Sequence, residues 1–171
     1  MIFHLINVDI TLSSSEAIVN AANSRLIKGG GVDAAIHRAA GDNLQQACIQ
    51  LGGCKTGEAC ITPGFNLKAS YVIHTVGPVW TGGKNNEHEL LSLCYENSLK
   101  LASRHNIQSI AFPNISTGIY GFPKPDAAII AIESCSKMML LPEMPIEVSF
   151  YCFDAENYNL YAEILKIRGL L

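Results

Sequence analysis

The chain has 171 residues and a formal net charge of −3, with 49% hydrophobic and 16% charged residues. This length and composition predict one folded domain over residues 1–171, with a substantial core, and argue against a disordered chain. No block of lysines and arginines occurs, so we expect no sequence-specific nucleic-acid binding. No apolar run approaches the roughly 20 residues of a membrane span, which argues against a membrane protein.

The six cysteines lack the spacing of a metal site or a disulfide framework, because no CxxC pair and no CxxC…HxxxH pattern occurs. Most lie in apolar stretches, where a free cysteine behaves as a small hydrophobic residue. We therefore expect buried, reduced thiols, no metal and a cytoplasmic location. Asp9 within the first ten residues, with no basic start, disfavours a signal peptide.

Apolar runs and turn residues predict strands that alternate with helices from residue 17 onward. The expected strands are residues 2–7, 17–22, 58–62, 71–76, 109–113 and 146–153. The expected helices are residues 32–40, 43–51, 87–104, 126–140 and 157–167, with Gly41 closing the first, Asp42 capping the second and Pro125 in the first turn of the fourth. This alternation predicts a three-layer α/β/α sandwich with a mixed, largely parallel sheet.

The stretch after the second expected strand carries the first chemical signal. Three glycines, residues 29–31, lead directly into a helix, and Asn23 and Asp33 flank them with an amide and a carboxylate. Glycine N–H groups that feed a helix N-terminus form an anion site, because the donors are unpaired and the helix dipole favours negative charge. A plain strand-to-helix turn, with Asp33 as a helix cap, is the open alternative, since a glycine run alone is a weak motif.

A second strand-to-helix junction, residues 116–121, has the sequence Ser-Thr-Gly-Ile-Tyr-Gly. In open α/β sheets, ligands bind outside the carboxyl ends of strands, where such junctions gather. Two junctions that face one another would offer many N–H groups to one diphosphate, whereas a simple turn is the alternative. Neither GxxxxGK[ST] nor GxGxxG occurs, which disfavours a nucleoside triphosphatase or an ordinary dinucleotide dehydrogenase.

Two histidines are further candidates for a chemical role. His74 lies in an apolar strand, which favours a core histidine over a general base. His37 follows Asp33 by four residues, so the two side chains can touch on one helical face, although a helix-surface histidine is an equal alternative. No GxSxG elbow and no HExxH motif is present.

Taken together and in order, these motifs resemble those of macrodomains of the MacroD type, over nearly the whole chain. The similar stretches are Asn20-Ala21-Ala22-Asn23, Gly29-Gly30-Gly31-Val32-Asp33, and residues 36–41, 56–59, 71–78 and 115–121. The resemblance implies a three-layer α/β/α domain that binds ADP-ribose and hydrolyses O-acetyl-ADP-ribose and ADP-ribose esters of acidic side chains. The implied partners are ADP-ribose, its esters and mono-ADP-ribosylated proteins, with no cofactor, and we expect a monomer.

The same resemblance implies roles for residues at the two ends of the ligand. Asp9 would bind the adenine amino group, Ile10 would lie beside the ring and Phe153 would stack on it. Asn23 would bind the distal ribose hydroxyls, and Asp33 would orient or activate the attacking water. The implied substrate-binding residues between the two ends are Gly30, Gly31, Val32, His37, Ser116, Thr117, Gly118, Ile119 and Tyr120, of which Tyr120 would wall the distal ribose.

The chain departs from the family pattern at two positions. Lys28 stands where the family usually has a fourth glycine, and Val8 stands where it has a glycine before the Asp-Ile-Thr unit. Two other functions share the implied site: a non-catalytic ADP-ribose reader and a phosphatase acting on ADP-ribose 1″-phosphate. The presence of both Asn23 and Asp33 favours a hydrolase, with either Asp33 or a substrate phosphate as the base.

Overall fold

The computed structural model describes residues 2–171, within which six strands form one sheet in the order β1-β6-β5-β2-β4-β3. The strands are β1 (Ile2–Ile6), β2 (Ala17–Ala21), β3 (Ala59–Pro63), β4 (Tyr71–Thr75), β5 (Ser109–Phe112) and β6 (Glu147–Tyr151). The helices are the short 3-10 helix η1 (Ile10–Leu12), α1 (Gly31–Ala40), α2 (Asp42–Leu51), α3 (Glu87–Arg104), α4 (Lys124–Met138) and α5 (Ala155–Ile167).

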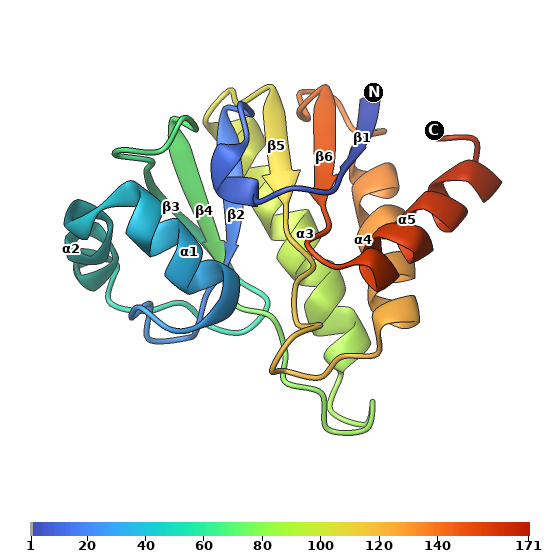
Figure 1. The fold of residues 1–171 in the computed structure, drawn as a ribbon, viewed down its shortest axis with the longest axis horizontal. Coiled ribbons are helices and arrows are strands. Elements are labelled where there is room, and N and C mark those ends of the chain that lie inside the picture. Colours follow the sequence, from blue (N-terminus) through green and yellow to red (C-terminus); the bar gives the residue numbers. More distant parts are fainter. Residues whose placement is uncertain (1) are drawn as a thin grey trace.

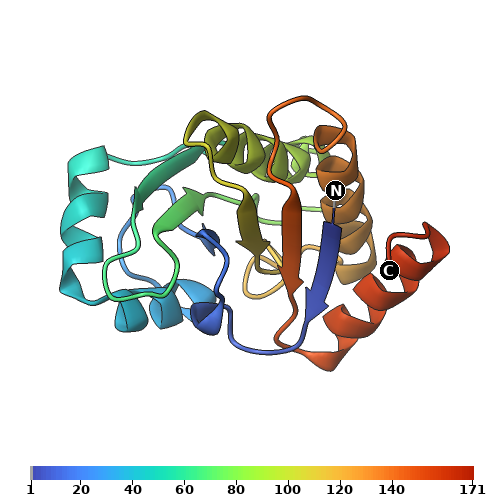
Figure 2. The ribbon, with the colours of Figure 1, turned by 90° about the horizontal axis from the view of Figure 1, so that it is seen from above.

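The sheet is mixed and largely parallel, which confirms the predicted fold class. Every neighbouring pair of strands is parallel except the edge pair of β3 and β4. Helices α3, α4 and α5 cover one face, and η1, α1 and α2 cover the other, with α2 towards the β3 edge (Figures 1 and 2). The carboxyl ends of the five parallel strands therefore meet at one edge, which is the lower edge in Figure 1.

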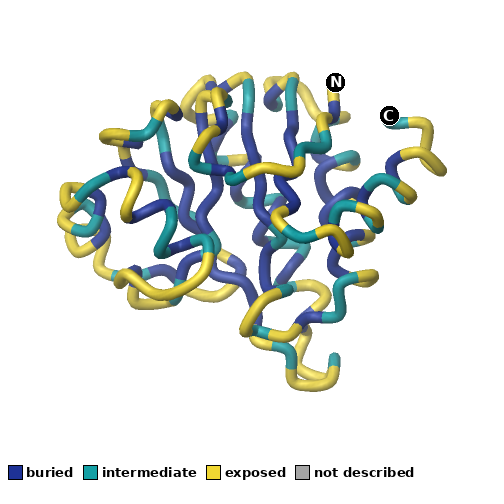
Figure 3. Tube along the Cα trace, viewed as in Figure 1, coloured by how far each residue is buried: buried dark blue, intermediate teal, exposed yellow. Residues whose placement is uncertain are grey.

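The central strands are buried on both faces, as the apolar runs predicted (Figure 3). Along β2, Ile18 packs with the helices on the α1 side and Val19 with those on the α3 side. Val72 and Ile73 on β4 repeat the same alternation, since successive side chains of a strand point to opposite faces. Two apolar clusters thus hold the sheet between its helices and make the strand ends a rigid base for loops.

The helix boundaries differ from the prediction at two capping residues. Asp42 was expected to cap α2, but it is the first residue of that helix, and Gly41 occupies the cap position. Gly41 turns the chain with a φ of 86° while its N–H bonds the His37 carbonyl, so one residue ends α1 and starts α2. Asp154 caps α5 by accepting a hydrogen bond from the N–H of Asn157, and the helix therefore starts two residues before the predicted Asn157.

All six cysteines are free thiols, five of them buried and Cys60 half-buried, in agreement with the sequence prediction. Burial raises the pKa of Cys94 to about 11, which keeps that thiol protonated at neutral pH. None of the helices in the described part of the chain, residues 2–171, is long and apolar enough to cross a membrane.

The polar loop before α3 is organised by one carboxylate, that of Glu87. Its oxygens accept hydrogen bonds from the Thr81 hydroxyl at 2.7 Å, the Thr81 N–H at 2.9 Å, the Gly83 N–H at 3.1 Å and the Asn85 N–H at 2.7 Å. The Thr81 hydroxyl and these N–H groups stabilise the charged form and lower the pKa of Glu87 from 4.5 to about 2. The loop thus depends on an ionised Glu87.

We expect Glu87→Gln to lower the free energy of unfolding near neutral pH. A carboxylate whose pKa is depressed on folding adds stability above its unfolded pKa, and this is lost as pH falls through the folded value. The difference between wild type and variant should therefore be constant above about pH 5 and shrink from pH 4.5 towards pH 2. Urea titrations between pH 3 and 7 measure it, with Glu89→Gln on the exposed side of α3 as control. A difference independent of pH would contradict this role.

Candidate functional site

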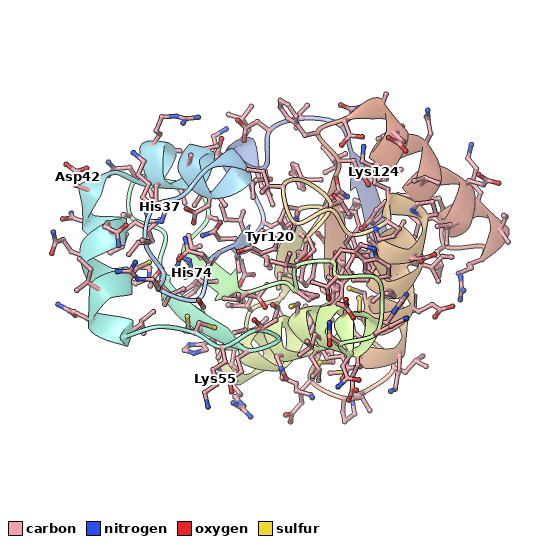
Figure 4. The ribbon with its side chains drawn as sticks, turned by 90° about the horizontal axis from the view of Figure 1, so that it is seen from below. His37, Asp42, Lys55, His74, Tyr120 and Lys124 are labelled. Carbon is pink, nitrogen blue, oxygen red and sulfur yellow. The ribbon has the colours of Figure 1, made fainter. Side chains whose placement is uncertain are left out.

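A cavity of about 720 Å³ opens at the carboxyl edge of the parallel strands. Figure 4 views this edge, with Tyr120 near its centre, Lys124 on the α4 side and His37 and His74 on the α1 side. Small-molecule sites are typically about 300–1,000 Å³, so the cavity has the size for a nucleotide-like ligand. Of the fourteen residues that the sequence assigned to the site, the cavity brings together Asp9, Ile10, Asn23, Gly30, Gly31, Val32, Asp33, Ser116, Thr117, Gly118, Ile119, Tyr120 and Phe153.

The expectation that the two glycine-containing junctions face one another is confirmed, because residues 29–33 and 115–120 line the same cavity. His37 is the one assigned residue that lies outside the lining. It is buried behind Asp33, with its Nε2 atom 3.5 Å from Asp33 Oδ1. The predicted Asp–His proximity is present, but it directs His37 towards the carboxylate rather than towards the cavity.

The first wall of the cavity is the start of α1. Gly30 is the cap residue of this helix and offers no side chain, so backbone faces the cavity. The N–H groups of Gly30, Gly31 and Val32 donate to no protein acceptor within residues 2–171. Unpaired N–H groups at the positive end of a helix dipole attract an anion.

The second wall is the loop between β5 and α4. Ser116 has a φ of 65°, and the loop closes by hydrogen bonds from the Phe122 N–H to the Ser116 carbonyl (2.9 Å) and from the Gly121 N–H to the Gly118 carbonyl (3.0 Å). A left-handed backbone costs a non-glycine residue roughly 1–2 kcal/mol, so this shape is imposed by its surroundings. The N–H groups of residues 116–120 have no acceptor in the described chain. They form a second anion-binding concavity opposite the first.

Asn23 and Asp33 meet at Gly29, at the α1 end of the cavity. A Cβ atom on Gly29 would lie 3.4 Å from Asn23 Nδ2 and 3.5 Å from Asp33 Oδ2. The Gly29 N–H donates to Asp33 Oδ2 at 2.6 Å, and the Asn23 amide is held by the backbone of Ile27, donating to its carbonyl at 2.6 Å. The amide and the carboxylate are therefore fixed side by side. Sequence reasoning did not foresee that Asn23 also shapes its own turn.

Behind the cavity, Asp33 belongs to a buried polar cluster. The carboxylate is only 5% exposed, and its Oδ1 atom accepts a hydrogen bond from Asn20 Nδ2 at 2.7 Å. His74 is fully buried next to Asn20, which confirms the prediction of a core histidine. Burial, together with the charge of His37, lowers the pKa of His74 to about 3, so its ring is neutral at physiological pH.

At the opposite end, Asp9 and Phe153 provide a polar and a flat apolar group. Asp9 Oδ1 accepts hydrogen bonds from the Thr11 N–H (2.9 Å) and the Thr11 hydroxyl (2.8 Å), which leaves Oδ2 without a donor in the described chain. Ile10 is buried beneath, whereas Phe153 is 82% exposed. An ionised carboxylate accepts but does not donate, so Oδ2 suits an exocyclic amine, and an exposed phenyl ring suits a stacked base.

Sequence reasoning missed a set of residues from the start of α5. Asn157 is buried in the lining, and its amide nitrogen donates to Asp154 Oδ2 at 2.8 Å and lies 3.5 Å from the Thr117 hydroxyl. The spacing Asp154-x-x-Asn157 is that of a capping residue and the N–H it binds, and could have located this helix start. Lys124 also lines the cavity, but ion pairs with Glu156 at 2.7 Å and Asp154 at 3.5 Å neutralise its charge.

Lys28, one of the two departures from the family pattern, does not line the cavity, whereas Val8, the other, does. The Lys28 N–H donates to Gln45 Oε1 at 2.7 Å, and Gln45 Nε2 donates to the Leu26 carbonyl at 3.1 Å. Gln45 on α2 therefore holds the approach to the glycine loop, while the Lys28 side chain is exposed. Among residues 2–171, no group of three or more His, Cys, Asp or Glu side chains is arranged to hold a metal ion.

The fold and the site define a class: a three-layer α/β domain with an anion-binding cleft between two strand-to-helix junctions, and an amide–carboxylate pair at one end. Comparison with known proteins agrees with this class. Residues 19–131 match the family model described as Macro domain, and the chain belongs to this family.

Similar proteins cover the chain almost from end to end. A macro domain-containing protein of Chlorobaculum tepidum is 56% identical over 166 residues, which are 96% of each chain. A protein of Escherichia fergusonii named O-acetyl-ADP-ribose deacetylase is 51% identical over 170 residues, covering 97% of this chain and 96% of that protein. The Trypanosoma brucei macrodomain, solved in complex with ADP-ribose, superposes with a TM-score of 0.89 at 39% identity, covering 95% of this chain and 68% of that one.

Proposed function

We propose that this macrodomain binds ADP-ribose in the cavity and hydrolyses O-acetyl-ADP-ribose. The observation that carries the proposal is the convergence, in one cavity, of two sets of unpaired N–H groups with the Asn23–Asp33 pair at one end. The E. fergusonii relative named as a deacetylase and the T. brucei complex with ADP-ribose support it.

In this proposal each part of ADP-ribose binds one part of the cavity. The diphosphate lies between residues 30–32 and 116–120, where backbone donors balance its charge without cationic side chains. Adenine then extends towards Phe153, and its amino group reaches Asp9 Oδ2. The distal ribose reaches Asn23 and Asp33, where an amide offers both a donor and an acceptor to a diol.

Hydrolysis requires a water molecule held against the acetyl carbonyl carbon. The water oxygen forms a bond to that carbon, the ester C–O bond breaks, and the ribose oxygen leaves with a proton, giving acetate and ADP-ribose. Asp33 aligns the water, because each carboxylate oxygen keeps a lone pair beyond the bonds to Gly29 and Asn20. The proton taken from the water goes to Asp33 or to a diphosphate oxygen and from there to the departing ribose oxygen. The second water proton is lost when the acetic acid product ionises to acetate.

We extend the proposal to ADP-ribose linked by an ester to acidic side chains of proteins. Gly29, Gly30 and Gly31 are exposed at the distal-ribose end, so a ligand attached to a larger protein has access to Asp33. One chain supplies both walls of the cavity, which supports action as a monomer. The six free thiols support a reducing, cytoplasmic setting.

Three substrates separate this proposal from its alternatives. Purified protein is incubated with O-acetyl-ADP-ribose, a glutamate-ADP-ribosylated protein and ADP-ribose 1″-phosphate, and products are quantified by chromatography and mass spectrometry. Release of ADP-ribose from the two esters is expected. Binding of ADP-ribose by calorimetry without release from any substrate would make the chain a reader, and release from the phosphate alone would make it a phosphatase.

Phe153→Ala is expected to weaken ADP-ribose binding by about 5- to 150-fold, because stacking of a base on an aromatic ring contributes roughly 1–3 kcal/mol. The turnover number at saturating substrate should not change, since the Phe153 ring lies at the end of the cavity away from Asp33. Isothermal calorimetry measures the affinity, with Phe65→Ala, an exposed phenylalanine outside the cavity, as the control. Equal affinities for the two variants would remove Phe153 from the adenine site.

A further inference from the structure

A chain of buried hydrogen bonds connects the β3 edge of the sheet to Asp33. Thr62 Oγ1 on β3 lies 2.9 Å from His74 Nε2 on β4, and His74 Nδ1 lies 3.1 Å from Asn20 Nδ2 on β2. The same Asn20 nitrogen donates to Asp33 Oδ1 at 2.7 Å. Thr62, His74 and Asn20 are buried and lie outside the cavity lining, so none of them touches a ligand directly.

The chemistry of these groups fixes where the protons are. Ionised Asp33 only accepts, so the amide of Asn20 must present its nitrogen, not its oxygen, to the carboxylate. That nitrogen only donates, so His74 Nδ1, which also faces it, must be an unprotonated acceptor. The ring is then neutral with its proton on Nε2, donated to the Thr62 hydroxyl. The lowered pKa of His74, about 3, agrees with a neutral ring.

Asn20 adopts this orientation at a cost. Its Oδ1 atom is buried and has no hydrogen-bond donor in the described chain. Leaving a buried acceptor unpaired costs roughly 1–3 kcal/mol, so the amide is turned by the two acceptors on its nitrogen and not by a partner for its oxygen. His37 does not replace Asn20 as the donor to Asp33 Oδ1, because its Nε2 atom is 3.5 Å away, at the outer limit of a hydrogen bond.

We propose that His74 is a positioning residue that acts on Asp33 through Asn20. Its unprotonated Nδ1 holds the second N–H of the Asn20 amide, which directs the first N–H at Asp33 Oδ1 and fixes the carboxylate against the water that it aligns. The inference rests on the proposed hydrolysis. The alternative is that His74 only fills the core with its hydrogen bonds made, so that its loss affects folding and nothing else.

Three variants distinguish a positioning role of His74 from a purely structural one. His74→Leu removes every acceptor from the ring position and keeps an apolar volume there. His74→Asn carries an oxygen on Cγ, where His74 carries Nδ1, so it restores the acceptor for Asn20. Thr62→Val keeps the shape of the threonine and removes the oxygen that holds the His74 proton on Nε2. The matched readouts are the turnover number and KM for O-acetyl-ADP-ribose, the ADP-ribose Kd by calorimetry, and the thermal unfolding midpoint.

For His74→Leu we expect the turnover number to fall by about 10- to 100-fold, since misplacing a reacting group by about 1 Å costs on that order. The ADP-ribose Kd of the folded protein should change less than threefold, because the diphosphate loops are untouched. His74→Asn should recover most of the turnover, and Thr62→Val should give a smaller loss in the same direction. Equal turnover in the leucine and asparagine variants, or a loss of ADP-ribose affinity as large as the loss of turnover, would overturn the proposal.

Two structural measurements test the role of His74 independently of activity. If the wild-type protein hydrolyses no ester, that result refutes the proposed function but not the positioning of Asp33 by His74. Nitrogen-15 NMR of the wild-type histidines should show His74 protonated only on Nε2 and not titrating between pH 5 and 9. Crystal structures should keep Asn20 Nδ2 within hydrogen-bond distance of Asp33 in His74→Asn and lose that contact in His74→Leu. A protonated Nδ1, or an unchanged contact in the leucine variant, would show that His74 does not position Asp33.

Discussion

Asp33→Ala is expected to lower the turnover number for O-acetyl-ADP-ribose by about 10²- to 10⁴-fold, the usual contribution of a positioned acid or base. Asp33 is the carboxylate at the distal-ribose end of the cavity and is held from both sides, by the Gly29 N–H and the Asn20 amide. Alanine removes the group that aligns the water and leaves the diphosphate-binding N–H groups of residues 30–32 in place.

Binding should change much less than turnover in this variant. The glycine loop loses the anchor at Gly29, which weakens binding, but the ligand no longer faces a buried negative charge. We therefore expect an ADP-ribose Kd within about tenfold of wild type, a small change beside the loss that general acid–base residues produce. Single-turnover assays and calorimetry measure the two quantities, with Asp42→Ala, an exposed carboxylate on α2, as the control. Turnover equal to that of the control would remove Asp33 from the reaction.

Gly77→Ala is expected to weaken ADP-ribose binding by about 100-fold, the loss of two charge-assisted hydrogen bonds of roughly 1.5 kcal/mol each. A Cβ atom on Gly77 would lie 2.1 Å from Ser116 Oγ and 2.7 Å from Ile115 Cγ2. Both neighbours are buried, and Ser116 already has a left-handed backbone, so the loop cannot absorb the methyl group in place. Its N–H groups must move away from the diphosphate.

A second glycine provides the matched control for this variant. A Cβ atom on Gly64 would lie 1.9 Å from the Ala69 carbonyl oxygen, an equally close approach, but Gly64 is not part of the cavity. Both variants should lose stability, since overpacking typically costs about 1–3 kcal/mol. Only Gly77→Ala should raise the Kd of the folded fraction, measured by calorimetry after the folded fraction is established by circular dichroism. Unchanged affinity in Gly77→Ala would mean that the 116–120 loop does not hold the diphosphate.

Much of the fold could be predicted because local chemistry decides it. Apolar runs of four to eight residues bounded by glycine or proline gave strands, and helical spacing of apolar residues gave helices. The errors concern caps. Asp42 has the right side chain to begin a helix, but the turn at Gly41 joins two helices without room for a separate cap. Asp154 was overlooked because its partner is the N–H of Asn157, which only the fold identifies as unpaired.

Much of the site could be predicted for the same reason. The glycines before α1 and in the 116–121 loop indicate unpaired N–H groups. Such groups are a property of the local backbone and can be predicted without knowing any distant partner. The roles of Asp9 and Phe153 came from family resemblance and not from local chemistry. Their place in the cavity depends on where β1 and β6 end in the sheet.

Local sequence thus determines which segments become strands and which helices start at glycines without a side-chain cap. It also indicates that an anion is the natural ligand of such strand-to-helix junctions. Strand order is a different kind of information. Only the order β5-β2-β4 places the two junctions across one cavity, and only the parallel register of β2 and β4 sets Asn20 beside His74, 54 positions apart in sequence. The physical reason is that a side chain's own preferences act over a few residues, whereas the neighbour that orients it is chosen by how whole elements bury their apolar faces together.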